Sequence, residues 1–362
     1  MKKILGQSRA VETLRAGLRS GRLAHAWIFA GPRGVGKFTT AIELARIILD
    51  PDADADGTVD PDGETSRLID AAIHPDLHVI RKELAQYSQD AQIRGRKQLN
   101  IPIGVLREHI LGGMVGEKFV EAPAYRTPAR GHSKVFIIDE AELVDPIGQH
   151  SLLKTLEEPT AGTYLILVTS RPQRLVPTIH SRCRHAAFVP LDDAAMAQWF
   201  DSAGLEVVGP ERQWIGEFCD GSPGVALLAA RYELHRWHTT LAPMLEDLAR
   251  GRFPAEMGQT MAALIDGFAV EWVKRHDNAS KDAANKDGAR FMLMILASHV
   301  NRQLADAVQR GRPADAPLRV IDLIADAELQ LQANVNLKQV LENLAIQWAQ
   351  AAAGVRVDSV SV

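Results

Sequence analysis

Short apolar runs alternate with amphipathic stretches along the first half of the chain. Such runs are typical of buried strands in a parallel sheet. Three of them occupy residues 22–31, 134–139 and 163–170. In addition, residues 37–49 and 148–159 carry apolar side chains at three- and four-residue spacing, which predicts helices. Because strands and helices follow one another in turn, we expect an α/β domain with a parallel sheet over residues 1–190.

The second half of the chain has a different pattern. After residue 191 the strand-like runs cease, and apolar residues recur at helical spacing. Three segments rich in turn-forming or polar residues interrupt it: 221–224, 276–288 and 309–317. We therefore expect a small helical unit over residues 191–232 and a larger all-helical domain over residues 233–355.

Composition places the chain among ordinary globular proteins. Its 362 residues are enough for two or three domains. The proportions of hydrophobic residues, 46%, and of charged residues, 24%, are ordinary for a globular protein. With a net charge of −4, any contact with nucleic acid needs a local basic patch. The two cysteines, Cys183 and Cys219, are too far apart for a metal-binding pair, and no apolar run approaches the ~20 residues of a membrane span. These features predict a cytoplasmic protein without a signal sequence.

A phosphate-binding loop is the first candidate site. The sequence GPRGVGKFTT, residues 31–40, follows a predicted strand, begins a predicted helix and matches G-x-x-x-x-G-K. Loop amides and the helix N-terminus attract phosphate, and Lys37 adds a charge for the β- and γ-phosphates. The predicted cofactor-binding residues are Gly31, Gly34, Gly36, Lys37, Phe38 and Thr39. The alternative is a loop retained only for its fold.

Phe38 departs from this pattern at the position where a Ser or Thr holds Mg²⁺. A phenyl ring cannot coordinate the metal, and Thr39 points about 100° around the helix from the metal position. We therefore expect ATP or ADP to bind with Mg²⁺ weakly held or absent, and hydrolysis to be badly impaired.

Polar residues follow two of the later strands. Asp139 and Glu140 resemble the acidic pair that holds a metal's water shell and orients an attacking water, although acids also commonly end strands. After the next strand, Thr169 or Ser170 can bond a γ-phosphate or the attacking water, and a plain turn is an equally good interpretation. We predict catalytic roles for Asp139, Glu140 and Thr169.

Two arginines follow a turn-forming serine in PTIHSRCRH, residues 177–185. A guanidinium group at such a place can reach a phosphate bound by a neighbouring subunit. Taken alone, arginines such as Arg182 and Arg184 after a turn are usually just solvated side chains.

The order of these motifs resembles that of the AAA+ clamp-loader ATPases of bacterial DNA replication. The matching segments extend over nearly the whole chain: ILGQ (4–7), HAWIFAGPRGVGK (25–37), HPDLHVI (74–80), KVFIIDEAE (134–142), SLLKTLEEP (151–159), LILVTSRPQRLVPTIHSRCR (165–184), GSPGVALL (221–228) and NVNLKQVLENL (334–344). The resemblance implies a RecA-like domain, a small helical lid and a C-terminal collar that joins a five-subunit ring. It also implies that Arg182 reaches the ATP of the adjacent subunit, as an arginine finger acting in trans.

The resemblance further implies partners. They are the motor ATPase and delta subunits of a hetero-oligomeric clamp loader of DNA polymerase III and, through the complex, the sliding clamp and primed DNA. Motor subunits keep the hydroxyl that Phe38 replaces, and they carry an arginine where this chain has Gly224. Both departures favour a non-hydrolysing stator. An ATP-hydrolysing motor subunit and an interaction scaffold with no nucleotide role remain the alternatives.

Two further segments raise alternatives of their own. Many clamp-loader ATPases hold zinc with four cysteines after the loop helix, but this chain has none there, so zinc cannot be carried over. The acidic segment in their place puts Asp52, Asp54, Asp56 and Asp60 at the spacing of an EF-hand-like calcium loop, but Gly63 stands where the last acid belongs, and a solvated loop is the simpler interpretation. The basic run at 93–98 is interpreted either as a DNA contact in a ring's central chamber or as a solvated loop.

Overall fold

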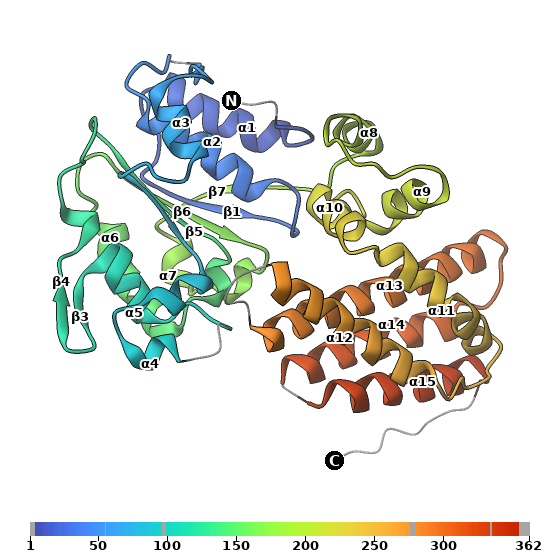
Figure 1. Cartoon of the computed structure of the whole chain (residues 1–362). Coiled ribbons are helices and arrows are strands. Elements are labelled where there is room, and N and C mark those ends of the chain that lie inside the picture. Colours follow the sequence, from blue (N-terminus) through green and yellow to red (C-terminus); the bar gives the residue numbers. More distant parts are fainter. Residues whose placement is uncertain (1–3, 55, 96–98, 276–279, 334, 355–362) are drawn as a thin grey trace. The chain divides into compact units, whose positions relative to one another are not determined.

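The computed structural model describes residues 4–54, 56–95, 99–275, 280–333 and 335–354 (Figure 1). The chain divides into two compact units. The first comprises Met1–Leu205 and Asp220–Val225, and the second comprises Glu206–Cys219 and Ala226–Val362.

A five-stranded parallel sheet forms the centre of the first unit, as the sequence predicts. Its spatial order is β2 (Leu77–Ile80), β5 (Lys134–Ile138), β6 (Thr163–Thr169), β1 (Ala26–Ala30) and β7 (Arg184–Ala187). Because all the strands run in the same direction, their carboxyl ends meet at one edge of the sheet, where open α/β sheets bind ligands. β1, which precedes the phosphate-binding loop, lies between β6 and β7 in this RecA-like order.

Helices cover both faces of this sheet. The α-helices of the first unit are α1 (Ser8–Arg19), α2 (Lys37–Leu49), α3 (Glu64–Asp70), α4 (Ala91–Arg94), α5 (Ile103–Leu106), α6 (Pro146–Glu157), α7 (Pro177–His180) and α8 (Asp193–Ser202). Figure 1 shows α1, α2 and α3 on one face and α5, α6 and α7 on the other. Alternate strand residues, such as Phe136 and Ile138 of β5, pack with Leu106 of α5 and Leu152 of α6. The core therefore follows from the period-two pattern of buried strands.

The segment between α5 and β5 forms a small antiparallel hairpin, β3 (Gly113–Val115) with β4 (Lys118–Val120), followed by a long loop. Asp76 holds the end of this loop. Asp76 is buried, with 2% of its surface exposed. Its carboxylate accepts hydrogen bonds of 2.7 Å from both Ala129 N and Arg130 N. The HPD sequence thus fixes the approach to β5.

Replacing Asp76 by Ala should destabilise the chain by about 2 kcal/mol, because two backbone N–H groups lose a charged acceptor. Urea unfolding measures this change as a lower midpoint at an unchanged slope. The exposed Asp62 provides the control, and Asp62→Ala should change stability by less than about 0.5 kcal/mol. Equal midpoints for wild type and Asp76→Ala would contradict this role.

The second unit is entirely helical over its described residues, as the sequence predicts. Its helices are α9 (Gly209–Phe218), α11 (Leu234–Ala249), α12 (Met257–Arg275), α13 (Lys281–Gln309), α14 (Asp315–Gln332) and α15 (Leu337–Ala352), while α10 (Pro223–Arg231) crosses the boundary between the units. Aromatic rings of three helices meet inside it: Phe268 lies 6.1 Å from Trp237 and 5.7 Å from Phe291 between ring centroids. Among the helices of the described ranges, none is long and apolar enough to span a bilayer.

One predicted break is shorter than the sequence indicates. Residues 281–288 of the polar segment 276–288 form the first turns of α13, and Ser280 Oγ caps them by accepting a hydrogen bond from Ala283 N. The reason is that alanine and lysine are good helix formers whatever their polarity. Residues 276–279 lie outside the described part of the chain. The predicted domain limits at 190 and 232 stay predictions; α8 belongs to the first compact unit and α9 to the second.

Candidate nucleotide-binding site

The phosphate-binding loop lies at the carboxyl end of β1 and leads into α2, as its sequence context predicts. Gly36 precedes the helix with φ 97°, and among the described residues no side chain caps the first turn of α2. The N–H groups of that turn are therefore available to an anion. Gly31 N donates to Thr169 O over 3.3 Å, which ties the start of the loop to the end of β6.

Lys37 is buried, with 6% of its surface exposed. Its Nζ donates to Gly31 O over 2.7 Å and also to Pro32 O, so the ammonium group lies under the loop. Burial lowers the pKa of Lys37 to about 8, although the carboxylates of Glu142 and Asp139 oppose this shift. Phosphate oxygens are natural replacements for these two carbonyls.

The pKa of Lys37 predicts that nucleotide binding depends on pH. Because the free amine is half charged near pH 8, raising the pH from about 7 to about 9.5 should weaken the affinity for an ATP analogue about tenfold. The carboxylates of Glu142 and Asp139 and the guanidinium of Arg33 are the charges that act on this amine. Fluorescence titration checks the prediction, and Lys37→Ala should remove the pH dependence. A wild-type affinity that is constant over this range would contradict it.

The GSPG segment closes over the tip of the loop within the first unit. Ser222 Oγ donates to Arg33 O over 2.8 Å, and Gly224 N donates to Gly34 O over 2.9 Å. Gly34 has φ +75°, and a Cβ there would lie 2.3 Å from Ser222 Oγ. A Cβ on Gly224 would lie 2.6 Å from Gly34 Cα. Any side chain at position 224 would therefore collide with the loop backbone.

Asp139 and Glu140 lie near the loop, at the end of β5, and both carboxylates face cations of this chain. Arg81 Nε lies 3.3 Å from Asp139 Oδ2, and Lys82 Nζ lies 2.9 Å from Glu140 Oε2. Arg33 also forms an ion pair with Glu140. Glu140 adopts the left-handed backbone conformation, with φ 53°, a strained geometry that is common at functional sites.

Burial and these cations together shift the pKa values of Asp139 and Glu140 in opposite directions. Burial raises the pKa of Asp139 above its ordinary value in spite of the nearby Arg81 charge. Burial also raises the pKa of Glu140, but Arg33 and Lys82 outweigh it and leave that pKa below the ordinary value. Glu140 is therefore held firmly as an anion by protein cations.

Sequence reasoning missed Glu142, which follows these acids on a short 3₁₀ turn. Its Oε1 accepts hydrogen bonds from Ser170 Oγ at 2.6 Å and Ser170 N at 3.2 Å. Its Oε2 is buried without a hydrogen-bond partner among the described residues. Only the DEAE sequence hinted at this residue, because its role depends on β5 and β6 being neighbours. Thr169, which is 1% exposed, uses its Oγ1 to accept from Arg171 N.

The residues around the loop do not fit a magnesium ion. The ring of Phe38 replaces the hydroxyl ligand, and the Asp139 carboxylate is engaged by Arg81. The guanidinium carbon of Arg81 also lies 4.2 Å from the centroid of the Phe38 ring, within the range of a cation–π contact. Thr39 is exposed, whereas Thr40 turns its hydroxyl back to Gly36 O. Neither of these two threonines replaces the hydroxyl that Phe38 lacks.

Arg182 lies outside this cluster, after α7. Its Nη1 donates to Thr178 O over 3.0 Å, and its guanidinium forms an ion pair with Glu157 at the end of α6. One third of its side chain is exposed, and Arg184, two residues later, is exposed on β7. Arg182 thus lies at the surface of its own unit, held in place by a partly exposed acid.

The sequence matches a known protein family over most of the first compact unit. The profile described as DNA polymerase III, delta subunit, matches residues 6–192, which is more than half of the chain. The chain belongs to this DNA polymerase III delta-subunit family. The matched range includes the loop, both strand-end acids and Arg182.

Curated relatives of this family member carry DNA polymerase III names. DNA polymerase III subunit delta' of Bacillus subtilis is 30% identical over 192 residues, which is 52% of this chain and 50% of the relative. Subunit delta' of Pseudomonas aeruginosa is 32% identical over 180 residues, covering 50% and 48%. Subunit gamma/tau of Mycobacterium tuberculosis is 28% identical over 343 residues, covering 88% and 52%. The chain spans about half the length of these relatives.

A solved structure is similar at lower identity. The crystal structure of a DNA polymerase III, gamma subunit-related protein from Thermotoga maritima matches 95% of this chain and 99% of its own at 14% identity, with a TM-score of 0.45.

The aspartates of the acidic loop make local contacts within the described part of the chain. Asp54 Oδ1 accepts from Asp56 N and Thr58 N, Asp60 Oδ1 accepts from Asp62 N, and Asp56 pairs with Arg19. No group of three potential metal ligands occurs in the ranges that the structure describes. Ala55 of this loop and residues 96–98 of the basic run lie outside those ranges, as do Asn334 of the late motif and residue 355 at the predicted domain end.

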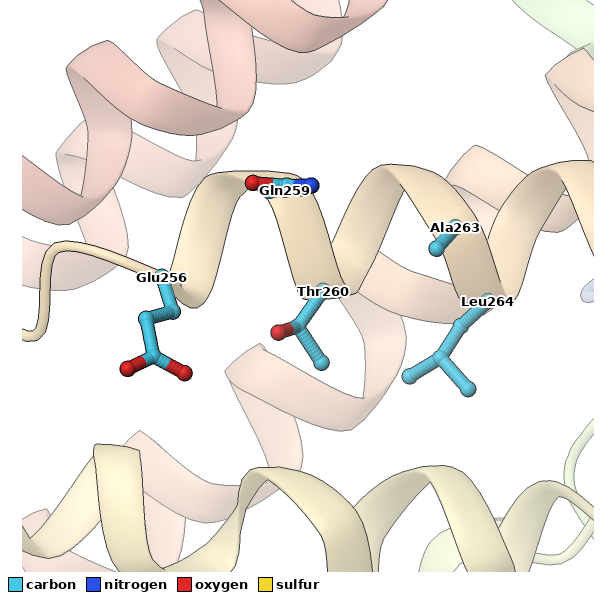
Figure 2. A pocket seen from close by; sticks show the side chains of 5 residues that line it. All are labelled: Glu256, Gln259, Thr260, Ala263 and Leu264. Carbon is cyan, nitrogen blue, oxygen red and sulfur yellow. The ribbon is translucent and has the colours of Figure 1, made fainter.

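A shallow depression lies along the start of α12. Glu256, Gln259, Thr260, Ala263 and Leu264 line it. In Figure 2, Glu256, Thr260 and Leu264 point to the same side of the helix. Since its lining residues come from the start of one helix and the residue before it, the depression is an open surface and lacks the converging polar groups of a ligand site.

Proposed function

We propose that this chain is the delta-prime type of clamp-loader subunit of a bacterial DNA polymerase III holoenzyme. The observation that carries the proposal is a family match combined with Phe38 in place of the metal-binding hydroxyl. In this role the chain acts as a stator: it holds a ring of motor ATPase and delta subunits that loads the sliding clamp on primed DNA. Such work at the replication fork belongs to the cytoplasm.

Two roles are assigned to named residues. The loop with Lys37 binds ATP or ADP with little or no hydrolysis. Arg182, partly exposed at the surface of the first unit, reaches the ATP of the adjacent subunit as an arginine finger. Its ion pair with the partly exposed Glu157 supports this assignment, because a surface pair is worth at most about 1 kcal/mol and opens readily for a phosphate.

An ATP-hydrolysing motor subunit is the second candidate. It is favoured by the gamma/tau relative, which matches 88% of this chain, and by the intact Lys37, Asp139 and Glu140. The structure weighs against it at two places. Phe38 and Arg81 occupy the metal's surroundings, and Gly224 packs against Gly34 where a motor carries an arginine.

Native mass spectrometry tests the proposed function. The chain is mixed with the gamma/tau and delta subunits encoded by the same genome. We expect a five-subunit complex that contains one copy of this chain. A chain that stays alone, or one that replaces several motor subunits in the ring, would refute the delta-prime assignment.

A further inference from the structure

Arg81 makes two contacts at the loop that the proposed function does not use. Its guanidinium carbon lies 4.2 Å from the centroid of the Phe38 ring, and its Nε lies 3.3 Å from Asp139 Oδ2. Arg81 directly follows β2, and β2 pairs with β5, whose carboxyl end carries Asp139. Sheet order thus brings Arg81 to the edge where the loop lies.

The two contacts define a position. In a metal-dependent loop, Mg²⁺ lies between the hydroxyl after the loop lysine and the acid at the end of a nearby strand. Phe38 and Asp139 occupy these two sequence positions here, and Arg81 contacts both of them. Its guanidinium group therefore lies where the two protein groups that would flank the metal come together.

We propose that Arg81 takes the place of Mg²⁺, so that the loop binds a nucleoside di- or triphosphate without a divalent cation. The inference rests on the nucleotide binding proposed above and names its chemistry. A guanidinium group is permanently charged and has five N–H donors, so it can keep Asp139 and still donate to phosphate oxygens. The ring of Phe38 contacts this group within cation–π range.

The remaining charges of the site agree with a built-in cation. Lys82 and Arg33 already form ion pairs with Glu140, the second acid that a metal site would use. A divalent cation would have to displace protein cations from both carboxylates. Exchanging Phe38 for a hydroxyl residue alone should therefore leave the site independent of metal.

A titration of a fluorescent ATP analogue into the full chain, in excess EDTA and in excess Mg²⁺, tests the inference. Wild type should bind with affinities that agree within about threefold in the two media. Arg81→Ala and the longer Arg81→Gln should each bind about tenfold more weakly in EDTA. Arg126→Ala is the matched control, because Arg126 is also an exposed arginine paired with an acid, Glu121, and it should bind like wild type.

The double variant Phe38→Thr/Arg81→Ala completes the test. With a hydroxyl restored and the guanidinium removed, it should bind about tenfold more tightly in Mg²⁺ than in EDTA. Thermal melting shows that each variant is folded, which we expect because the side chain of Arg81 is partly exposed.

Three results would overturn the inference. Wild-type binding that requires Mg²⁺ overturns it but leaves the proposed nucleotide binding intact. If both folded Arg81 variants bind the ATP analogue in EDTA as tightly as wild type does, the inference is overturned, but the proposed nucleotide binding is not. Absence of binding in both media overturns the inference together with the proposed nucleotide binding, while the assembly experiment still decides the clamp-loader role.

Discussion

Replacing Arg182 by Ala should lower ATP turnover at the neighbouring site of the reconstituted ring by about 10³-fold. The reason is that a guanidinium group supplied in trans neutralises charge that develops on the transferring phosphoryl group. Steady-state ATPase assays of rings that differ only in this subunit measure the effect.

Two controls accompany this experiment: the stability of the Arg182→Ala variant and the turnover of an Arg184→Ala ring. Arg182→Ala removes a surface ion pair with Glu157, so the variant should stay folded and lose at most about 1 kcal/mol. Arg184→Ala removes an exposed arginine two residues later and should leave the turnover unchanged. Wild-type turnover by a ring that contains Arg182→Ala would exclude the arginine-finger role.

The isolated chain should hydrolyse ATP no faster than its own Lys37→Ala variant. Phe38 removes one metal ligand and Arg81 occupies the Asp139 carboxylate, so the charge that Mg²⁺ normally neutralises in phosphoryl transfer has no metal partner. A phosphate-release assay at saturating nucleotide measures this rate. Phe38→Thr alone should not raise it, since Arg81 stays in place.

This second prediction separates the stator from the motor. Sustained turnover by the purified wild-type chain, abolished by Lys37→Ala, would show that the metal chemistry survives Phe38. The chain would then be an ATP-hydrolysing member of its family. Preparations of the two proteins are matched by melting temperature, so that a difference in folding cannot imitate the result.

The strand, loop and helix around Lys37 were predictable because each depends on neighbouring residues. A short apolar run, a glycine-rich turn and a 3.6-residue pattern identify β1, the loop and α2 without knowledge of the rest of the chain. Asp139 and Glu140 were also predictable, because they directly follow an apolar run and a parallel sheet brings the carboxyl ends of its strands to one edge.

Arg81 and Glu142 were not predictable, because their roles depend on which strands are neighbours. Arg81 reaches Asp139 only because β2 pairs with β5, and Glu142 reaches Ser170 only because β5 pairs with β6. Arg81 belongs to no motif identified in the sequence, and the DEAE sequence that contains Glu142 does not reveal its contact with Ser170. The contact between Gly224 and Gly34 was not predictable either, because these two residues are 190 positions apart in the chain.

The acidic segment at 50–64 shows how a spacing of acids can resemble a metal site, although a solvated loop was the simpler interpretation. The aspartates fit a calcium loop in sequence, but Asp54 and Asp60 use their carboxylates for backbone N–H groups two to four residues later. Short polar side chains readily form such local turns. A spacing of acids predicts a metal site only when the backbone turns them toward one point.

Loading of the sliding clamp onto primed DNA tests the central claim most directly. Fluorescently labelled clamp is loaded by rings assembled from gamma/tau and delta subunits with wild-type chain, without it, or with Arg182→Ala. If this chain is a clamp-loader subunit, loading will require it and will be strongly reduced by Arg182→Ala. Loading at full rate in its absence would contradict the account.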